Sequence, residues 1–255
     1  LALTCEALAR SIYNLSAQTE QIMTTQLLRQ GLHNRPKNLR VILQEEIDAI
    51  EAERYDAILL VYGMCGMSTV GLTARHTPLV LPRAHDCITL YLGSQKRYNE
   101  EFQRHPGTYW YSVDYMERAE AGAGVALGAA GIEESEAQYE EYVEKFGQET
   151  ADYLIEEMRK WSQHYTRAAF IETGLGDSAP YEQMALEKAQ KEDWIFERLQ
   201  GNNRLLAALV NGEWSEEEFL VVPPGHTIGQ DFRDDRLVKA ENVEDTEKAQ
   251  RSQSE

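Results

Sequence analysis

The chain has few cysteines and no long hydrophobic segment. Only 3 of its 255 residues are cysteine, an odd number without the close spacing of a small disulfide-linked scaffold. This argues against a secreted disulfide framework and for a reducing, cytoplasmic compartment. No apolar run approaches the roughly 20 residues that cross a membrane. No signal peptide is visible either, so we expect no membrane association.

Positive charge is also scarce. Lys and Arg total 25 against 43 Asp and Glu, which gives a formal net charge of −18 and a pI of about 4.8. The phosphates of nucleic acids and anionic lipids would be repelled, which argues against nonspecific binding to either. A small anionic ligand in a local positive pocket stays compatible with this charge. The hydrophobic fraction of 42% is enough for one large α/β domain or two small ones.

Short apolar runs alternate with helical patterns in the first half of the chain. Strands are expected at residues 1–4, 39–43, 57–62, 79–81 and 107–112. Helices are expected at residues 8–30, 45–54 and 86–92. Such alternation is typical of βαβ units, and continuous apolar strands are typical of a parallel sheet with helices on both faces. We therefore predict an α/β fold with a doubly wound, mainly parallel sheet of the Rossmann-like or flavodoxin-like type.

The second half begins with an Ala/Gly-rich stretch, residues 119–131, which we expect to be a loop or a poorly formed helix. Residues 134–165 then show apolar side chains at three- and four-residue steps with an acidic opposite face, which predicts a long amphipathic helix. Whether it forms a lid or a contact in a homo-oligomer stays open. Further on, strands are expected at residues 167–171 and 219–222, and a helix at 181–199.

These elements suggest one α/β domain over residues 1–230, with a helical insertion at about residues 119–165. Residues 231–255 are charged and lack aromatic anchors, so we expect a disordered tail there.

All three cysteines follow strand-like runs. Cys5, Cys65 and Cys87 come shortly after the expected strands 1–4, 57–62 and 79–81. In open parallel sheets, ligands bind beyond the carboxyl ends of the strands. In a flavodoxin-like order these three strands are neighbours, about 4.8 Å apart. We therefore predict that the three thiols converge at one edge of the sheet and bind a metal ion.

Thiolate is a soft ligand that favours zinc, copper(I) or iron–sulfur clusters. Catalytic zinc commonly has three protein ligands and one open position, so the fourth position falls to His85, to Glu6 or to a substrate. One alternative is a [4Fe–4S] cluster with one open iron. Another is that the cysteines are small hydrophobic residues of the core.

Five residues beside the cysteines are candidates for catalysis or substrate binding. Glu6 and His85 are candidate bases, Asp86 a carboxylate that orients His85, and Tyr62 and Arg83 candidate substrate-binding residues. Four of them have a structural alternative. Glu6 suits a helix N-terminus, and Asp86 suits a helix cap. Tyr62 suits the core, and Arg83 suits a surface ion pair.

Two segments also carry a family resemblance. Residues 62–66 form Tyr-Gly-x-Cys-Gly, and residues 85–87 form His-Asp-Cys, the more specific of the two. With the cysteine after the first strand, the chain resembles the family known as domain of unknown function 1638. Residues 93–94, 107–109, 212–214 and 219–225 are similar as well, so the resemblance spans most of residues 1–230.

The resemblance implies metal binding at Cys5, Cys65 and Cys87, with His85 as a further ligand, and an association with corrinoid-dependent methyl-transfer systems. The leading hypothesis is a zinc-dependent, methyltransferase-like enzyme that acts on a small-molecule substrate with a corrinoid on a partner protein. The alternatives are a metal or corrinoid carrier or accessory protein without catalysis, and a three-cysteine [4Fe–4S] enzyme. The Asp-x-His-x-x-Gly corrinoid loop is absent, which argues against base-off cobalamin binding through that motif.

Overall fold

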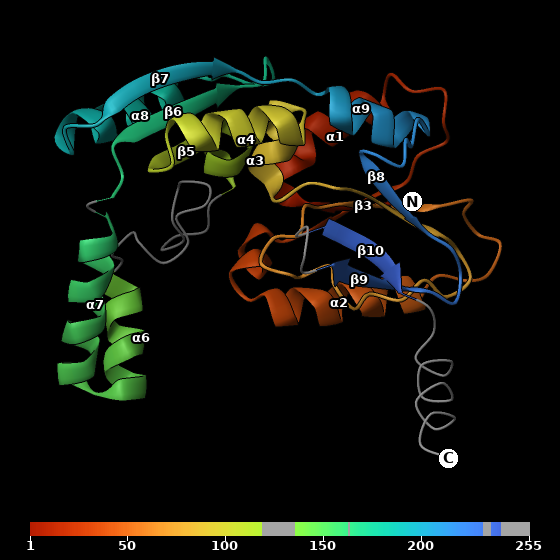
Figure 1. The fold of residues 1–255 in the computed structure, drawn as a ribbon, viewed down its shortest axis with the longest axis horizontal. Helices are drawn as coiled ribbons and strands as arrows, with labels where there is room; N and C mark the ends of the chain where they lie inside the picture. The colour runs from red at the N-terminus through yellow and green to blue at the C-terminus, as the bar shows by residue number, and fades with distance from the viewer. Residues whose placement is uncertain (119–135, 163, 232–235, 241–255) are drawn as a thin grey trace. The chain divides into compact units, whose positions relative to one another are not determined.

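The computed structural model describes residues 1–118, 136–162, 164–231 and 236–240 (Figure 1). They divide into two compact units. Unit 1 holds Leu1–Cys5, Ile12–Cys87 and the described residues from Arg204 on, and unit 2 holds Glu6–Ser11 and the described residues of Ile88–Asn203. The predicted α/β class with a mainly parallel sheet is confirmed. The expected domain over residues 1–230 spans both units. No described helix is long and apolar enough to cross a membrane.

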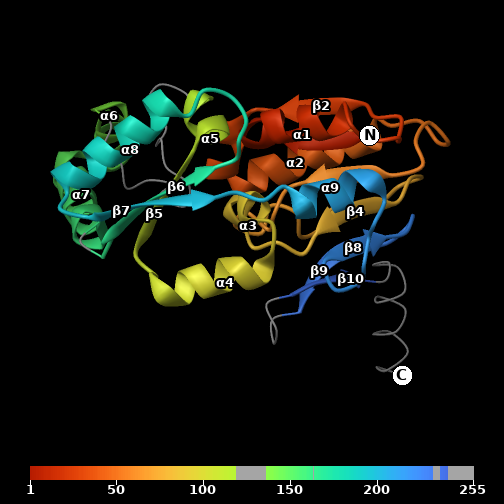
Figure 2. The same cartoon turned by 90° about the horizontal axis from the view of Figure 1, so that it is seen from above.

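Unit 1 is built on a five-stranded sheet in the order β2-β1-β3-β4-β8. Its strands are β1 (Ala2–Cys5), β2 (Thr25–Leu28), β3 (Ile58–Val61), β4 (Leu79–Pro82) and β8 (Phe219–Val222). The first four run parallel, and β8 pairs antiparallel with β4 (Figure 2). Every residue of β1, β3 and β4 is buried, as expected for continuous apolar strands. Because β1, β3 and β4 are adjacent and parallel, their carboxyl ends share one edge.

One predicted strand of unit 1 is wrong. Residues 39–43 belong to α2 (Pro36–Asp48), which begins with a proline in its first turn. Leu39, Leu43 and Ile47 recur every four residues and are buried, whereas Val41 is 57% exposed. This is the period of a helix, not of a strand. The acidic helix expected at residues 45–54 is only the end of α2, whose last residue is Asp48.

The predicted helix at residues 8–30 is also wrong over most of its length. The chain forms the 3-10 helix η1 (Glu6–Leu8), then α1 (Ala9–Ser16), and after a loop the strand β2 beside β1. Ile22, which completed the apparent apolar stripe, is 100% exposed in that loop. A second 3-10 helix, η2 (Gln30–Asn34), leads into α2, and α9 (Arg204–Asn211) precedes β8.

The expected tail at residues 231–255 is wrong for one described segment. β10 (Arg236–Ala240) pairs antiparallel with β9 (Thr227–Asp231), and Leu237 is buried. Burial of this leucine stabilises the strand. The charged residues around it led us to expect disorder from the sequence. Residues 241–255, expected to be disordered, lie outside the described residues.

Unit 2 contains a parallel sheet in the order β5-β6-β7, formed by β5 (Thr108–Ser112), β6 (Arg167–Glu172) and β7 (Ile195–Gln200). The predicted helix at residues 181–199 is too long, because α8 (Ala179–Lys191) ends before Asp193, whose φ is +57°. The chain then pairs with β6 as β7. Aromatic side chains of β5 and β6 pack against small residues of α8. This core comprises Tyr109, Tyr111, Val113, Met116, Ala168, Phe170, Ala185 and Ala189.

The other described helices of unit 2 are α3 (Cys87–Leu92), which begins in unit 1, α4 (Gln95–Arg104), α5 (Val113–Glu117), α6 (Glu136–Phe146) and α7 (Gln148–Ser162). α6 and α7 lie side by side (Figure 1) and replace the single helix predicted at residues 134–165. Gly147 breaks that helix, because its φ of +81° is left-handed. The loop or poorly formed helix expected at residues 119–131 lies outside the described residues.

A charged cluster is buried at the start of β6. Arg167 is 0% exposed, and its guanidinium donates to Glu101 at 2.9 Å, to Glu197 at 2.7 Å and to the Thr108 hydroxyl at 3.0 Å. The same guanidinium lies 5.3 Å from the centre of the Trp110 ring. The two carboxylates compensate the charge of Arg167. Without them, burial of this guanidinium would be strongly destabilising.

Candidate functional site

The three cysteines lie at the shared carboxyl edge of β1, β3 and β4. Cys5 is the last residue of β1, and Cys65 lies in the loop that follows β3. Cys87 lies beyond β4 and begins α3. The loops after β3 and β4 are joined by two backbone hydrogen bonds, from Met64 N to Ala84 O at 2.9 Å and from Cys65 N to His85 O at 3.2 Å. These bonds continue the pairing of the strands into the loops, so Cys65 is held beside the segment that carries Cys87.

Gly63 makes this close approach sterically feasible. A Cβ atom at this position would lie 2.6 Å from the Cα of Asp86, 2.7 Å from its N and 2.8 Å from its carbonyl carbon. These are backbone atoms, which cannot rotate away as the end of a side chain can. Only glycine therefore fits where the loop after β3 crosses the loop after β4.

The loop then forms a left-handed turn. The φ angles of Cys65, Gly66 and Met67 are +42°, +65° and +72°. A positive φ is uncommon for residues other than glycine, and such residues gather at functional sites, where the surrounding structure holds them in place. Cys65 thus owes its position to a backbone conformation that the sequence alone would not favour.

The three thiols interact electrostatically. Cys5 is buried, and Cys65 and Cys87 are partly buried. Burial raises the pKa of the Cys65 thiol to about 12, with smaller contributions from the charges of Asp86 and Cys5, while amide donors at Gly63 and Cys87 act in the opposite direction. Burial also raises the pKa of Cys87 well above its usual value, again with contributions from Cys65, Asp86 and Cys5. Each thiolate therefore disfavours ionisation of the others.

The thiols suit a soft metal ion by chemical type and by their nearness, but they do not already surround one point. Within the described ranges, no group of three or more His, Cys, Asp or Glu side chains has an arrangement that could hold a metal ion as it stands. Metal binding by Cys5, Cys65 and Cys87 would therefore require their side chains to rotate toward a common centre.

His85 and Asp86 form a pair beside the cysteines. Nδ1 of His85 lies 3.1 Å from Oδ2 of Asp86, and half of the His85 side chain is exposed. Because a carboxylate can only accept, the neutral tautomer of His85 that suits this contact carries its hydrogen on Nδ1. Asp86 also directly precedes α3, at the position expected for a cap.

The remaining candidates are placed as follows. Arg83 donates from its guanidinium to the backbone carbonyls of Glu216 at 3.0 Å, Phe219 at 3.1 Å and Leu237. It therefore links β4 to the chain around β8 and β10, which gives it a structural role. Tyr62 directly follows β3 and is buried. Glu6, the first residue of η1, is partly buried.

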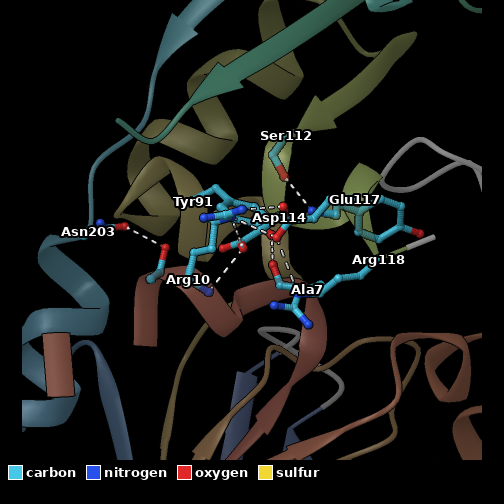
Figure 3. A network of polar contacts seen from close by, with 10 residues as sticks. Ala7, Arg10, Tyr91, Ser112, Asp114, Glu117, Arg118 and Asn203 are labelled. Atoms are coloured by element: carbon cyan, nitrogen blue, oxygen red, sulfur yellow. Dashed lines mark hydrogen bonds and ion pairs between the residues drawn. The ribbon is translucent and has the colours of Figure 1, made fainter. Parts of the chain in front are cut away.

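A second polar network, not found from the sequence, lies in unit 2 around Asp114 of α5 (Figure 3). Asp114 is 1% exposed and accepts from the backbone amide of Arg10 at 3.1 Å and from that of Ser11. Burial raises the pKa of Asp114 to about 6. Arg10 also forms two hydrogen bonds with Glu117, at 2.9 and 2.7 Å. The only sequence signal was an acidic residue two positions after a strand.

Asp114 acts as a cap supplied by a distant residue. The amides of Arg10 and Ser11 belong to the first turn of α1, where backbone N–H groups lack partners within the helix. The hydroxyl of Tyr91 donates to the carbonyl of Ala7, and that of Ser11 to Asn203 at 3.4 Å (Figure 3). The segment Glu6–Ser11, which follows Cys5 directly, is thus held by side chains of unit 2.

Comparison with known proteins gives one finding. Neither the curated proteins nor the solved structures contain a significant match to the chain. A family model described as "Protein of unknown function (DUF1638)" matches residues 27–210, well over half of the chain. The matched residues include Cys65, His85, Asp86 and Cys87, and Cys5 precedes them. The chain therefore belongs to the DUF1638 family of proteins of unknown function.

Proposed function

We propose that this protein binds one zinc ion through Cys5, Cys65 and Cys87. The observation that carries the proposal is the placement of the only three cysteines of the chain at the ends of three adjacent parallel strands, where their charges interact. Ligands of open α/β sheets bind at this edge. The Cys65 loop and the Gly63 contact hold two of the thiols on neighbouring segments.

A cation solves the electrostatic problem of this site. Without it, three thiolates and Asp86 would repel one another in a largely buried place. Burial raises the pKa values of Cys65 and Cys87, and this repulsion adds a smaller contribution in the same direction. A thiol that coordinates zinc is deprotonated, because the charge of the ion outweighs this repulsion. Thiolate ligands select zinc over magnesium or calcium.

His85 is the candidate for a fourth ligand or a base beside the three thiolates. Its bond to Asp86 orients the ring, which would then provide either the fourth ligand or a proton acceptor for a substrate. Glu6 is the alternative ligand or base by its place after Cys5. With three protein ligands and an open position, the arrangement would be that of a catalytic rather than a structural zinc site.

For the reaction, we propose methyl transfer linked to a corrinoid on a partner protein. The support for this reaction is that the Tyr-Gly-x-Cys-Gly and His-Asp-Cys segments resemble those of the DUF1638 family, and this resemblance implies an association with corrinoid-dependent methyl transfer. Bound zinc supplies a thiolate or other nucleophile that stays ionised at neutral pH. The role of the chain would be to exclude water from the buried thiols and to accept the substrate proton at His85. A metal or corrinoid carrier without catalysis, and a three-cysteine [4Fe–4S] enzyme, are the competing proposals.

Elemental analysis and an absorption spectrum of protein purified without oxygen test the site. We expect about one zinc per chain and no colour, and loss of that zinc in Cys65→Ser and Cys87→Ser. The control is Met184→Leu, which removes one sulfur atom from an exposed position and should leave the zinc in place. Unchanged metal content in both cysteine variants would refute the site. A brown protein with iron and sulfide would support the iron–sulfur alternative.

Methyl transfer is tested separately with methylcobalamin and a small thiol. If the protein is an enzyme, the absorbance of methylcobalamin should decrease as the methyl group is transferred to the thiol, and this decrease should depend on zinc. A protein that retains its zinc but leaves the methylcobalamin intact would favour the carrier or accessory role.

A further inference from the structure

The left-handed turn at Cys65 is held by helix α2. The guanidinium of Arg40 donates through Nη2 to the carbonyl of Met67 at 2.6 Å. A Cβ atom on Gly66 would lie 3.0 Å from the ring of Pro36, the first residue of α2. Arg40 and Pro36 therefore bound the turn, one through a hydrogen bond and the other by contact. Two of the three left-handed residues are not glycine, so the turn needs such external support.

Arg40 is the first of three polar residues that recur every four positions on α2. Gln44 accepts from the amide of Thr73 at 2.8 Å and donates to its carbonyl at 3.2 Å. Asp48 forms two hydrogen bonds with Arg75, at 2.7 and 3.2 Å. This polar stripe, Arg40, Gln44 and Asp48, contacts the chain from Met67 to Arg75 in order. Its first member contacts Met67, two residues from Cys65, and its last lies on the exposed surface.

Arg40 is not placed for the greatest number of hydrogen bonds. Its Nε atom is buried and has no hydrogen-bond partner among the described residues. A Cβ atom on Gly71 would lie 3.6 Å from its Cδ, so the stem of the side chain packs against the backbone. An arginine with a buried, unsatisfied donor costs stability, and such groups call for an explanation other than stability.

We propose that Arg40 is a positioning residue for the metal site, which rests on the proposed function. Its bond to the Met67 carbonyl fixes the left-handed turn and thereby the direction in which the Cys65 thiol approaches Cys5 and Cys87. Residues that orient ligands from outside a metal site affect affinity by about 10- to 100-fold when they are replaced. Arg40 would act in this way through the backbone.

The experiment compares Arg40→Met, Arg40→Lys and Asp48→Asn in the full chain. Zinc affinity is measured by competition with a chromophoric chelator. Alkylation of each cysteine by iodoacetamide in the metal-free folded protein is followed by mass spectrometry. For Arg40→Met we expect about 10- to 100-fold weaker zinc binding and faster alkylation of Cys65 relative to Cys87. Arg40→Lys keeps a donor that reaches a carbonyl and should recover part of both properties.

Asp48→Asn is the matched control, because it weakens the contact at the exposed end of the same stripe and should leave both properties unchanged. Wild-type behaviour of Arg40→Met, or equal losses in Asp48→Asn, would overturn the proposal. If the wild-type protein binds no zinc, the proposed function fails. The relative alkylation of Cys65 then still decides whether Arg40 positions it. If Arg40→Met does not fold, the comparison of Arg40→Lys with wild type decides in the same way.

Discussion

Replacing Gly63 with alanine should strongly weaken the proposed zinc binding while leaving most of the fold intact. The new Cβ atom would lie 2.6 Å from the Cα of Asp86, whereas carbon atoms in contact are about 3.5–4.0 Å apart. The loops after β3 and β4 must therefore separate by about 1 Å. Inserting a methyl group into such a packed place typically costs about 1–3 kcal/mol of folding free energy.

The effect on the site should be larger than the effect on stability. Zinc–sulfur bonds are about 2.3 Å long, and workable sites keep such distances within about 0.2 Å. A shift of about 1 Å between the segments that carry Cys65 and Cys87 would therefore exclude one of these ligands. We expect Gly63→Ala to bind zinc at least about 100-fold more weakly than wild type, as for loss of a ligand or its support.

Zinc competition and thermal unfolding, measured on the same samples, separate the two effects. Gly174→Ala is the control: Gly174 has a φ of +75° and open space around its Cα, so alanine there costs about 1–2 kcal/mol of backbone strain in unit 2. It should lower the melting temperature without weakening zinc binding. If Gly63→Ala binds zinc as wild type does, the close contact with Asp86 does not determine the site.

Two further predictions concern unit 2. Because burial raises the pKa of Asp114 to about 6 from its ordinary value of 3.8, its contribution to stability is fully present below that lower value and is lost as the pH rises through 6. In urea unfolding, Asp114→Asn should therefore lose about 1 kcal/mol less stability than wild type between pH 5 and 7.5, and an unchanged difference would contradict this. Glu101→Gln removes one of the carboxylates that compensate buried Arg167 and should cost about 3 kcal/mol. Lys96→Gln, in an exposed pair on the same helix, should cost less than about 0.5 kcal/mol.

The sequence predicts the elements whose burial is uniform. β1, β3 and β4 are continuous apolar runs and lie where they were expected. β2 was not predicted, because its residues are mostly half-buried and include the polar Gln26, so they do not form a continuous apolar run. The run Arg40-Val41-Ile42 favours a strand by its β-branched residues, and only the burial of Leu39 and Leu43 around it selects the helix. Such a choice depends on tertiary contacts.

The candidate site divides in the same way. The cysteines could be assigned to one sheet edge from their positions after strands, because parallel strands end together. The Gly63 contact with Asp86 and the bond from Arg40 to Met67 join segments distant in sequence. Neither contact can be predicted from the periodicity or spacing of residues in the sequence. Arg83 stays a candidate for substrate binding, and only the fold reveals that it donates to the backbone carbonyls of Glu216 and Phe219.

The exposed edge of β7, an outer strand of the β5-β6-β7 sheet, affects the tendency of the protein to self-associate at high concentration. Within the described part of the chain, β7 pairs only with β6, and Ile195 at its start is 60% exposed. A strand with one open side invites another polypeptide to add to it. Glu197 and Arg198, in the middle of this strand, introduce charges that a neighbouring strand would have to accommodate. A neutral replacement of Arg198 should therefore promote self-association, even though this residue lies far along the chain from every cysteine.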